Sequence, residues 1–343
     1  MINLPTAICI DSNEALSEVV TDLLIETLIG IDTESNSLHA YKERVCLIQL
    51  SSRSVDYIID PLLITDMQPL GMLLAAPTIE KIFHASEYDV MCLKRDFGFQ
   101  IVNLFDTMIA ARICGYRQVG LNNLLALHFG IDVDKSHQRD NWGERPLPED
   151  SLRYAQMDTH YLPALHDLLY NELVERGHID EALETFQEMG ETIPPHDGRN
   201  FDPDGYWKIG QPNRLSSSEM GILRELYYLR ETIAHDHDLP PFRIFSNQAM
   251  VDVAKRMPYS PRDLARIHNL PPAQVRRYGE QILEAVKRGR EISLPQAPFY
   301  RPPPADISDR YTALHTWRKN RAIQRGVESD VIVSRQTLWS LAE

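Results

Sequence analysis

The sequence predicts an α/β protein, with a mixed β-sheet flanked by helices, followed by an all-α domain and a partial second helical repeat. Three observations predict this fold. Apolar, β-branched segments come first and then alternate with helical segments, which is typical of a mixed sheet with helices on its faces. Strand patterns become scarce from Leu215 onward, and residues 226–254 resemble residues 314–342. At 343 residues the chain exceeds one typical core, so we expect more than one domain.

Within the first part, the spacing of apolar residues predicts each element. The expected elements are strands at 28–34, 45–51 and 54–60, a helix at 66–75, a strand at 78–84, a helix at 86–97, a strand at 101–105, and helices at 107–114, 121–129 and 151–175. The short turns between the first three strands predict an antiparallel meander. Asp106 is a suitable N-cap, and Gly98 and Gly130 stand where helices commonly end.

The second part has a different pattern. Residues 191–214 carry Pro, Gly and Asp without periodicity and are expected to form a linker. The segments that follow are amphipathic helices at 217–233, 246–257, 260–267 and 272–289 and a Pro-rich joint at 294–306. We therefore expect three domains, with boundaries at 1–206, 207–293 and 294–343.

The tail resembles the beginning of the helical domain. A shift of 88 residues places Arg230 on Arg318 and Ala254 on Ala342, among other matching apolar pairs. Amphipathic helices resemble one another easily, so chance is the alternative explanation. We expect a partial second unit, which either packs on the first or is a shortened copy of it.

The formal net charge of −14 is unevenly distributed along the chain. Residues 1–206 hold 14 basic and 34 acidic side chains, whereas residues 207–343 hold 21 and 15. An acidic part joined to a basic part indicates a division of labour, although two solvated surfaces would give the same pattern.

No apolar run approaches the roughly 20 residues that span a bilayer, so we expect no membrane association. The N-terminus lacks the basic and apolar regions of a secretory signal. The four cysteines are scattered without a C-x-x-C motif and are expected to be reduced thiols in the core. These features together predict a cytoplasmic protein.

Four carboxylates and a tyrosine have spacings that could gather them into one pocket. Asp32 and Glu34 are two apart on a predicted strand and share a face, and Tyr154 and Asp158 are four apart on a predicted helix. Asp89 lies early in an otherwise apolar helix. Each signal alone has an ordinary explanation, such as a solvated strand end or a favourable first-turn charge. Together, because clustered carboxylates repel, they predict a site for divalent cations.

Other residues are weaker candidates for contacting a substrate. Polar and basic side chains could hold phosphates, or could be structural or solvated. A tryptophan could stack on a base, although a position in the core that anchors the loop is favoured. These candidates are Gln49, His84, Lys135, Arg139, Trp142 and Arg145.

The ordered motifs D-T-E, H-x-x-x-x-D and Y-x-x-x-D resemble the DEDD superfamily of 3′→5′ exonucleases, in its tyrosine-containing branch, and within it the ribonuclease D family. The segments at 105–116 and 134–147 resemble that family, although Asp140-Asn141-Trp142 stands where we expect Ser-Asp-Trp. The helical part, with LYYLRETIAHDHDLPPFRIF, resembles the HRDC domain. The resemblance implies a ribonuclease H-like sheet, then an HRDC domain and a partial second HRDC-like unit.

The resemblance also implies a function. Asp32 would bridge two Mg²⁺ or Mn²⁺ ions, Glu34 and Asp158 would hold the ion with the attacking water, and Asp89 would hold the second. Tyr154 would orient that water or remove its proton, a choice the sequence leaves open. The implied activity is 3′→5′ exoribonuclease action on RNA, namely maturation of tRNA 3′ ends, with the HRDC-like part as an accessory nucleic-acid-binding surface. A DNA exonuclease and an inactive RNA- or protein-binding scaffold are the alternatives.

Overall fold

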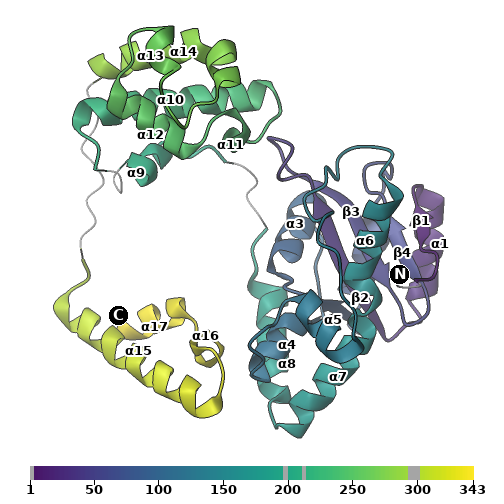
Figure 1. Ribbon diagram of the computed structural model, residues 1–343. Helices are drawn as coiled ribbons and strands as arrows, with labels where there is room; N and C mark the ends of the chain where they lie inside the picture. The colour runs from purple at the N-terminus through teal and green to yellow at the C-terminus, as the bar shows by residue number, and fades with distance from the viewer. Residues whose placement is uncertain (1–3, 196–199, 211–213, 293–301) are drawn as a thin grey trace. The chain divides into compact units, whose positions relative to one another are not determined.

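A computed structural model describes residues 4–195, 200–210, 214–292 and 302–343. The chain divides into two compact units, and Figure 1 labels their helices and strands. The sheet unit comprises Met1–Asn36, Arg44–Asp197 and Pro302–Glu343, and the helical unit comprises Ser37–Glu43 and Gly198–Arg301. Each unit has its own hydrophobic core. The units group the chain differently from the three predicted domains, because the tail belongs to the sheet unit and residues 37–43 belong to the helical unit.

Six strands form one mixed sheet in the order β1-β4-β3-β2-β5-β6. The strands are β1 (Ile8–Ile10), β2 (Leu28–Ser35), β3 (Val45–Ser51), β4 (Asp56–Ile59), β5 (Glu80–Phe83) and β6 (Leu104–Asp106). β2, β3 and β4 pair antiparallel, as the short turns predicted, whereas β1, β5 and β6 join in parallel. The predicted mixed sheet is therefore confirmed.

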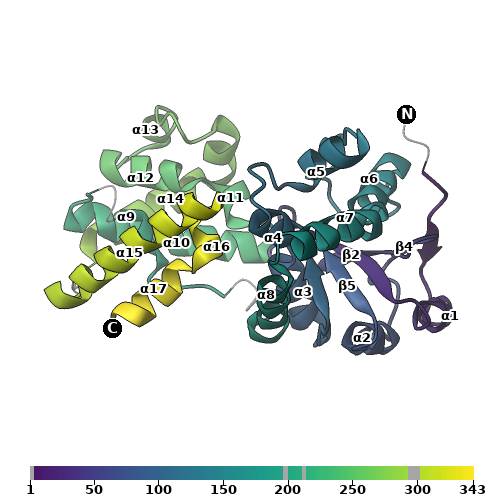
Figure 2. The ribbon, with the colours of Figure 1, turned by 90° about the horizontal axis from the view of Figure 1, so that it is seen from below.

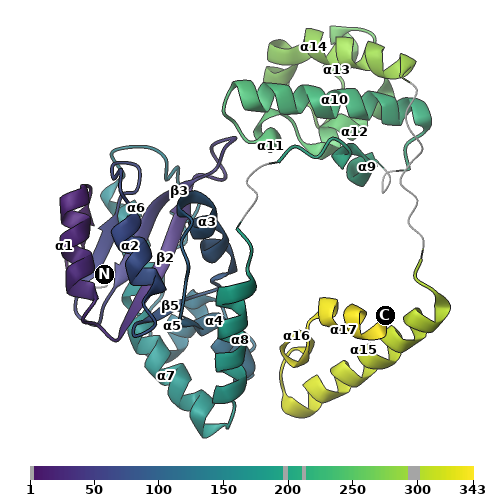
Figure 3. The same ribbon diagram turned by 180° about the vertical axis from the view of Figure 1, so that it is seen from behind.

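Helices cover both faces of this sheet. They are α1 (Asn13–Leu23), α2 (Gln68–Ala75), α3 (Glu87–Phe97), α4 (Thr107–Ile113), α5 (Leu121–Phe129), α6 (Glu149–His160), α7 (Leu162–Glu175) and α8 (Ile179–Thr192). The strands lie between α6 and α7 on one side and α2 on the other (Figure 2), and the α2 side faces the viewer in Figure 3. Gly98 and Gly130 end α3 and α5 in the left-handed conformation, and Asp106 caps α4, as predicted.

The predicted continuous helix at 151–175 is wrong. Two helices, α6 and α7, meet at Tyr161 instead. Pro163 lies in the first turn of α7, where the backbone N–H groups have no partner within the helix, so the lack of one costs nothing. Without that N–H, Pro163 cannot donate the hydrogen bond that would continue α6 into α7. Strand β1 and helices α1 and α8 are elements that the sequence pattern did not predict.

Gly30 allows the junction of α6 and α7 to approach the central strand. A Cβ atom built at Gly30 would lie 3.0 Å from the Thr159 carbonyl oxygen and 3.0 Å from Leu162 Cβ. Any larger residue there would push the helices away from β2, two residues before Asp32.

The helical unit confirms the predicted all-α domain. Its helices are α9 (Gly205–Gly210), α10 (Ser217–Asp236), α11 (Pro241–Ile244), α12 (Asn247–Arg256), α13 (Pro261–Leu264) and α14 (Pro272–Glu291). Helix α9 lies inside the predicted linker, and its Tyr206 and Trp207 enter the core of the unit, so the linker prediction is wrong there. Residues 196–199 and 211–213 of that linker lie outside the described residues.

The tail repeats the beginning of the helical unit. Helices α15 (Ala305–Arg325), α16 (Ser329–Ile332) and α17 (Arg335–Ala342) follow α10, α11 and α12 at the 88-residue shift. A hydrogen bond repeats with them: Arg230 Nη1 donates to the Phe245 carbonyl at 3.3 Å, and Arg318 Nη1 to the Val333 carbonyl at 3.0 Å. The predicted Pro-rich joint falls largely on residues 293–301, outside the described residues.

The structure bears on two expectations drawn from composition, the burial of the cysteines and the absence of a membrane-spanning helix. Cys46, Cys92 and Cys114 are buried free thiols, but Cys9 is exposed on the edge strand β1, so the expectation of a core thiol is wrong there. Across the described part of the chain, none of the helices has both the length and the apolarity that crossing a bilayer requires.

Candidate active site

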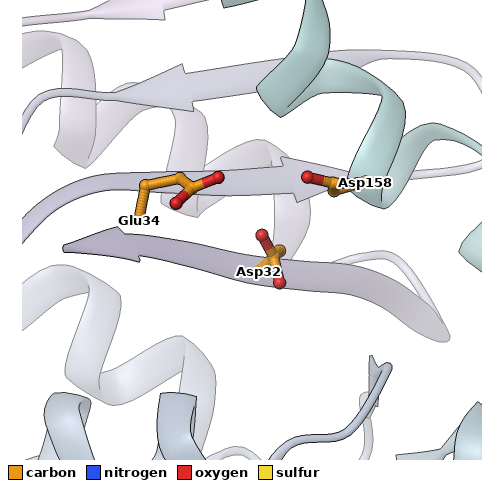
Figure 4. Close-up of side chains that lie close together, drawn as sticks. All are labelled: Asp32, Glu34 and Asp158. Atoms are coloured by element: carbon orange, nitrogen blue, oxygen red, sulfur yellow. The ribbon is translucent and has the colours of Figure 1, made fainter. Parts of the chain in front are cut away.

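Three carboxylates from two elements meet at the centre of the sheet unit. Asp32 and Glu34 project from β2 and Asp158 from α6, and each offers an oxygen atom within 4.8 Å of the others. Figure 4 shows the three groups turned toward one another. The i, i+2 spacing on the strand puts the first two on one face, and the packing of α6 against β2 brings the third.

A buried network fixes α6 in that position. Asp56 on β4 accepts hydrogen bonds from Gln156 Nε2 at 2.6 Å and from Ser51 Oγ at 2.7 Å, and His160 Nδ1 lies 2.8 Å away. The Ser51 hydroxyl also lies 2.7 Å from that of Thr159 on α6. Hydrogen bonds between side chains of α6 and side chains of β3 and β4 therefore fix the position of the helix above the sheet.

Asp89 joins the site from α3. It is only 7 % exposed and lines the same cavity as the other carboxylates, although it lies outside the group of three. The Thr33 hydroxyl donates to Asp89 Oδ1. A second carboxylate, Asp106, accepts from the backbone N–H groups of Ala85 and Ser86 just before α3 and so fixes the start of that helix.

Burial and mutual repulsion make ionisation of the clustered carboxylates unfavourable. Burial, together with repulsion from Asp89, Asp158 and Glu34, raises the pKa of Asp32 well above its ordinary value. Burial raises the pKa of Glu34 to about 9, and repulsion from Asp158 adds to it. Burial also raises the pKa of Asp89 and of Asp158 to about 7. Because burial and neighbouring carboxylates raise these pKa values, the cluster favours protons or cations at neutral pH.

Tyr154 lies one turn before Asp158 on α6. Burial and the neighbouring Asp158 raise the pKa of its hydroxyl far above the ordinary value. The group is therefore protonated at neutral pH. It can donate a hydrogen bond and hold a water molecule in place, but it is unsuited to removing a proton.

A cavity of about 440 Å³ opens above the carboxylates. His84 and Lys135, two of the weaker sequence candidates, line it. Burial lowers the pKa of His84, and its Nδ1 lies 2.9 Å from Thr107 Oγ1. Sequence reasoning missed further polar residues of the lining, namely Thr33, Asn122, Asn123 and Gln138. For Asn122 and Asn123 a signal was available in the sequence, because two adjacent polar residues follow Gly120 at the start of α5.

Trp142 and Arg145 anchor the loop before α6. Trp142 is 1 % exposed and packs in a small core cluster with Leu47 and Ala155, so it presents no open ring face to a base. Arg145 donates to both oxygens of Asp60 and to the Cys46 carbonyl. Its donors are thus engaged inside the protein.

Gln49 and Arg139 differ from the other candidates. Gln49 is 0 % exposed and does not line the cavity, so it cannot touch a substrate there. Arg139 lies exposed on the loop and remains a candidate for contacting phosphate.

The donor set fits hard divalent cations. It consists of carboxylate oxygens, which Mg²⁺ and Mn²⁺ prefer, whereas the described residues of the cluster include no thiol or imidazole ligand. Burial and mutual repulsion raise the pKa values of Asp32 and Glu34, and a bound cation would offset both effects.

Comparisons with known proteins agree with this geometry. The family model described as 3′-5′ exonuclease matches residues 7–174, and the HRDC domain model matches residues 219–286. Ribonuclease D of Gluconacetobacter diazotrophicus is 31% identical over 293 residues, which cover 84% of this chain and 73% of that protein. The chain belongs to the ribonuclease D family.

The family fold extends over almost the whole chain. The crystal structure of Escherichia coli RNase D, described as an exoribonuclease involved in structured RNA processing, aligns with a TM-score of 0.71 at 26% identity, over 98% of this chain and 90% of that one. Exosome complex component 10 of Mus musculus is 31% identical over 83% of this chain but only 33% of its own length. The chain thus spans about a third of that relative. Exonucleases with these motifs use divalent metal ions, which the acidic cluster is suited to bind.

Proposed function

We propose that this protein is a metal-dependent 3′→5′ exoribonuclease of the ribonuclease D type. The observation that carries the proposal is the gathering of Asp32, Glu34 and Asp158 within 4.8 Å of one another, in a chain of this family. A buried cluster of like charges is costly to fold, and a catalytic cation site gives a physical reason for it.

We assign each of the four carboxylates a role at the proposed cation site. Two ions would share Asp32, with Glu34 and Asp158 on one side and Asp89 on the other. When bound, divalent cations lower the pKa of a coordinated water and stabilise the charge that develops on phosphate. The Thr33 hydroxyl restrains Asp89 and the Asp56 network restrains α6, so the four carboxylates are held ready before substrate arrives.

Tyr154 would orient the attacking water. The water oxygen forms a bond to the phosphorus of the 3′-terminal nucleotide, and the bond from that phosphorus to the 3′-oxygen of the preceding nucleotide breaks. A proton moves to the leaving oxygen. The products are a nucleoside 5′-monophosphate and an RNA shorter by one nucleotide. Lys135, on the wall of the cavity, would contact a phosphate of the bound strand.

The helical unit offers an accessory surface for RNA. Tyr259 is 80 % exposed, and the Arg290 guanidinium lies 3.6 Å from the centre of its ring. Arg256, Arg262 and Arg266 are exposed nearby. A fixed aromatic ring among positive charges can stack on a base while the arginines contact phosphates.

Precursors of tRNA with a single-stranded 3′ end are the RNA that we propose as substrate, and the cytoplasm is the compartment. The four cysteines, all free thiols, fit a reducing compartment. A single-stranded end suits a cavity of about 440 Å³, which has room for a terminal nucleotide but not for a duplex.

Timed digestion of 5′-labelled oligonucleotides tests the function. With Mg²⁺, RNA is expected to give a ladder that shortens one nucleotide at a time, and EDTA is expected to abolish it. A DNA strand of the same sequence is the matched control. Preferential loss of the DNA strand would identify a DNA exonuclease, and undiminished cleavage of RNA in EDTA would refute the cation site.

A further inference from the structure

Gln49 has no hydrogen-bond partner although it is completely buried. Its relative exposure is 0 %, and neither Nε2 nor Oε1 has a hydrogen bond in the structure. An amide buried without hydrogen-bond partners destabilises the folded protein. Leucine or methionine has a similar volume and would avoid this cost, so stability does not explain a glutamine here.

The register of the sheet places Gln49 beside the acidic cluster. Gln49 on β3 is directly opposite Asp32 on β2, so the two side chains leave the same face of the sheet. Directly opposed residues have Cβ atoms about 5 Å apart, which is within the reach of a glutamine side chain.

Helix α6 closes this position from above. Leu47 and Ser51, two residues to either side of Gln49 on the same face, contact α6 through Ala155 and Thr159 respectively. The Gln49 amide is therefore enclosed between β2, which carries Asp32, and α6, which carries Asp158. Gln49 is not among the residues that line the cavity above the carboxylates.

We propose that Gln49 is a positioning residue for the metal ligand Asp32, whose carboxylate accepts a hydrogen bond from Gln49 Nε2 once the site is loaded with cations. This inference rests on the proposed function. In the structure the Gln49 amide has no hydrogen-bond partner, although Asp32 is directly opposite it in the sheet. With cations bound, the amide would donate to a carboxylate oxygen of Asp32 and so hold the orientation of that ligand. Groups that orient ligands in this way typically contribute 10–100-fold to metal affinity.

A pair of buried glutamines provides the matched test. Gln156 on α6 is also buried, but its Nε2 donates to Asp56 Oδ2 at 2.6 Å and to the Pro5 carbonyl at 2.8 Å. Gln49→Leu and Gln156→Leu therefore remove the same group from a position without partners and from one with two.

The measurements are thermal unfolding in EDTA and Mn²⁺ affinity by isothermal titration calorimetry, both on the full chain. Gln49→Leu is expected to keep or raise the melting temperature in EDTA and to weaken Mn²⁺ binding by about tenfold or more. Gln156→Leu is expected to lower the melting temperature. Gln49→Met repeats the first test with an unbranched side chain.

Each outcome decides the matter. Unchanged Mn²⁺ affinity in both Gln49 variants would overturn the positioning role. A lowered melting temperature in EDTA, or failure of both variants to fold, would overturn it too, because the amide would then have a structural partner. A parent protein that binds no Mn²⁺ would overturn the cation site itself, whereas normal Mn²⁺ binding without RNA cleavage would overturn the proposed function alone.

Discussion

Two buried acidic sites on either side of α6 differ in how their charges are satisfied. Asp56 is held by Ser51, Gln156 and His160, and these hydrogen bonds outweigh burial and lower its pKa. Asp158, two residues from Gln156 on the same helix, faces other carboxylates, and its pKa is raised to about 7. The hydrogen bonds to Asp56 are enough to stabilise its charge, whereas the few hydrogen bonds to the clustered carboxylates do not offset burial and mutual repulsion.

The largest effect is expected at the unsatisfied site. Asp158→Asn should reduce RNA cleavage by about 10³-fold or more, because it would remove one of the proposed cation ligands. The same change should raise the melting temperature in EDTA, since one repelling charge is lost. Single-turnover cleavage and thermal unfolding measure the two effects. A variant that cuts at the parental rate would contradict the assignment of ligands.

Replacing Asp56, the fully hydrogen-bonded carboxylate, should lower stability more than it lowers cation binding. Asp56→Ala leaves Gln156, His160 and Ser51 without their acceptor and should cost about 3 kcal/mol of unfolding free energy, measured by urea denaturation. Its Mn²⁺ affinity should fall less than that of Asp158→Asn, because Asp56 binds no cation. If Asp56→Ala were as stable as the parent, the network would not be what positions α6.

The pH dependence of stability should separate the two sites in the cation-free protein. Carboxyl groups whose folded pKa is raised bind more protons when folded than when unfolded. Unfolding free energy should therefore fall in EDTA as the pH rises from about 4, the unfolded pKa, through about 7 for Asp158 and toward about 9 for Glu34. Saturating Mg²⁺ should flatten this decline, because cations replace protons. A melting temperature in EDTA that rises over this window would contradict the predicted sign.

An exposed ion pair gives the smallest expected effect and a control for Asp56. Asp167 bonds Arg53 with both oxygens, but the two side chains are 44% and 49% exposed. Solvent screens such a pair, so Asp167→Asn should cost less than about 1 kcal/mol in the same urea measurement. A cost as large as that of Asp56→Ala would show that burial does not set the difference between the two carboxylates.

Local rules were enough to predict much of the fold and the chemical identity of the site. The D-T-E spacing puts Asp32 and Glu34 on one face of a strand whatever surrounds them. Asp106, Gly98 and Gly130 end or begin helices for reasons that lie within one turn of chain. The break at Tyr161 was missed because apolar periodicity continues across it, and α9 was missed because a six-residue helix has too little periodicity to detect.

Features that depend on pairing between distant segments could not be predicted. The partners of Asp56 lie up to 104 residues away, and nothing near Asp56 in the sequence indicates them. The pairing of Arg145 with Asp60 likewise requires the folded loop, whereas a core position for Trp142 was the favoured interpretation from the sequence and is confirmed. For Gln49, sequence reasoning offered contact with substrate or solvent, and the sheet register placed it beside neither.

Gly30 gives the site an unexpected point of vulnerability. Because a Cβ atom at Gly30 would lie only 3.0 Å from the Thr159 carbonyl oxygen, the absence of a side chain at Gly30 sets how closely α6 approaches β2. That approach in turn sets the distance between Asp158 and Asp32. Gly30→Ala would act as a wedge, moving Asp158 outward from Asp32 by a few tenths of an ångström without touching any ionisable group. Harmful variation in this enzyme is therefore to be sought among small, chemically inert residues as well as among its acids.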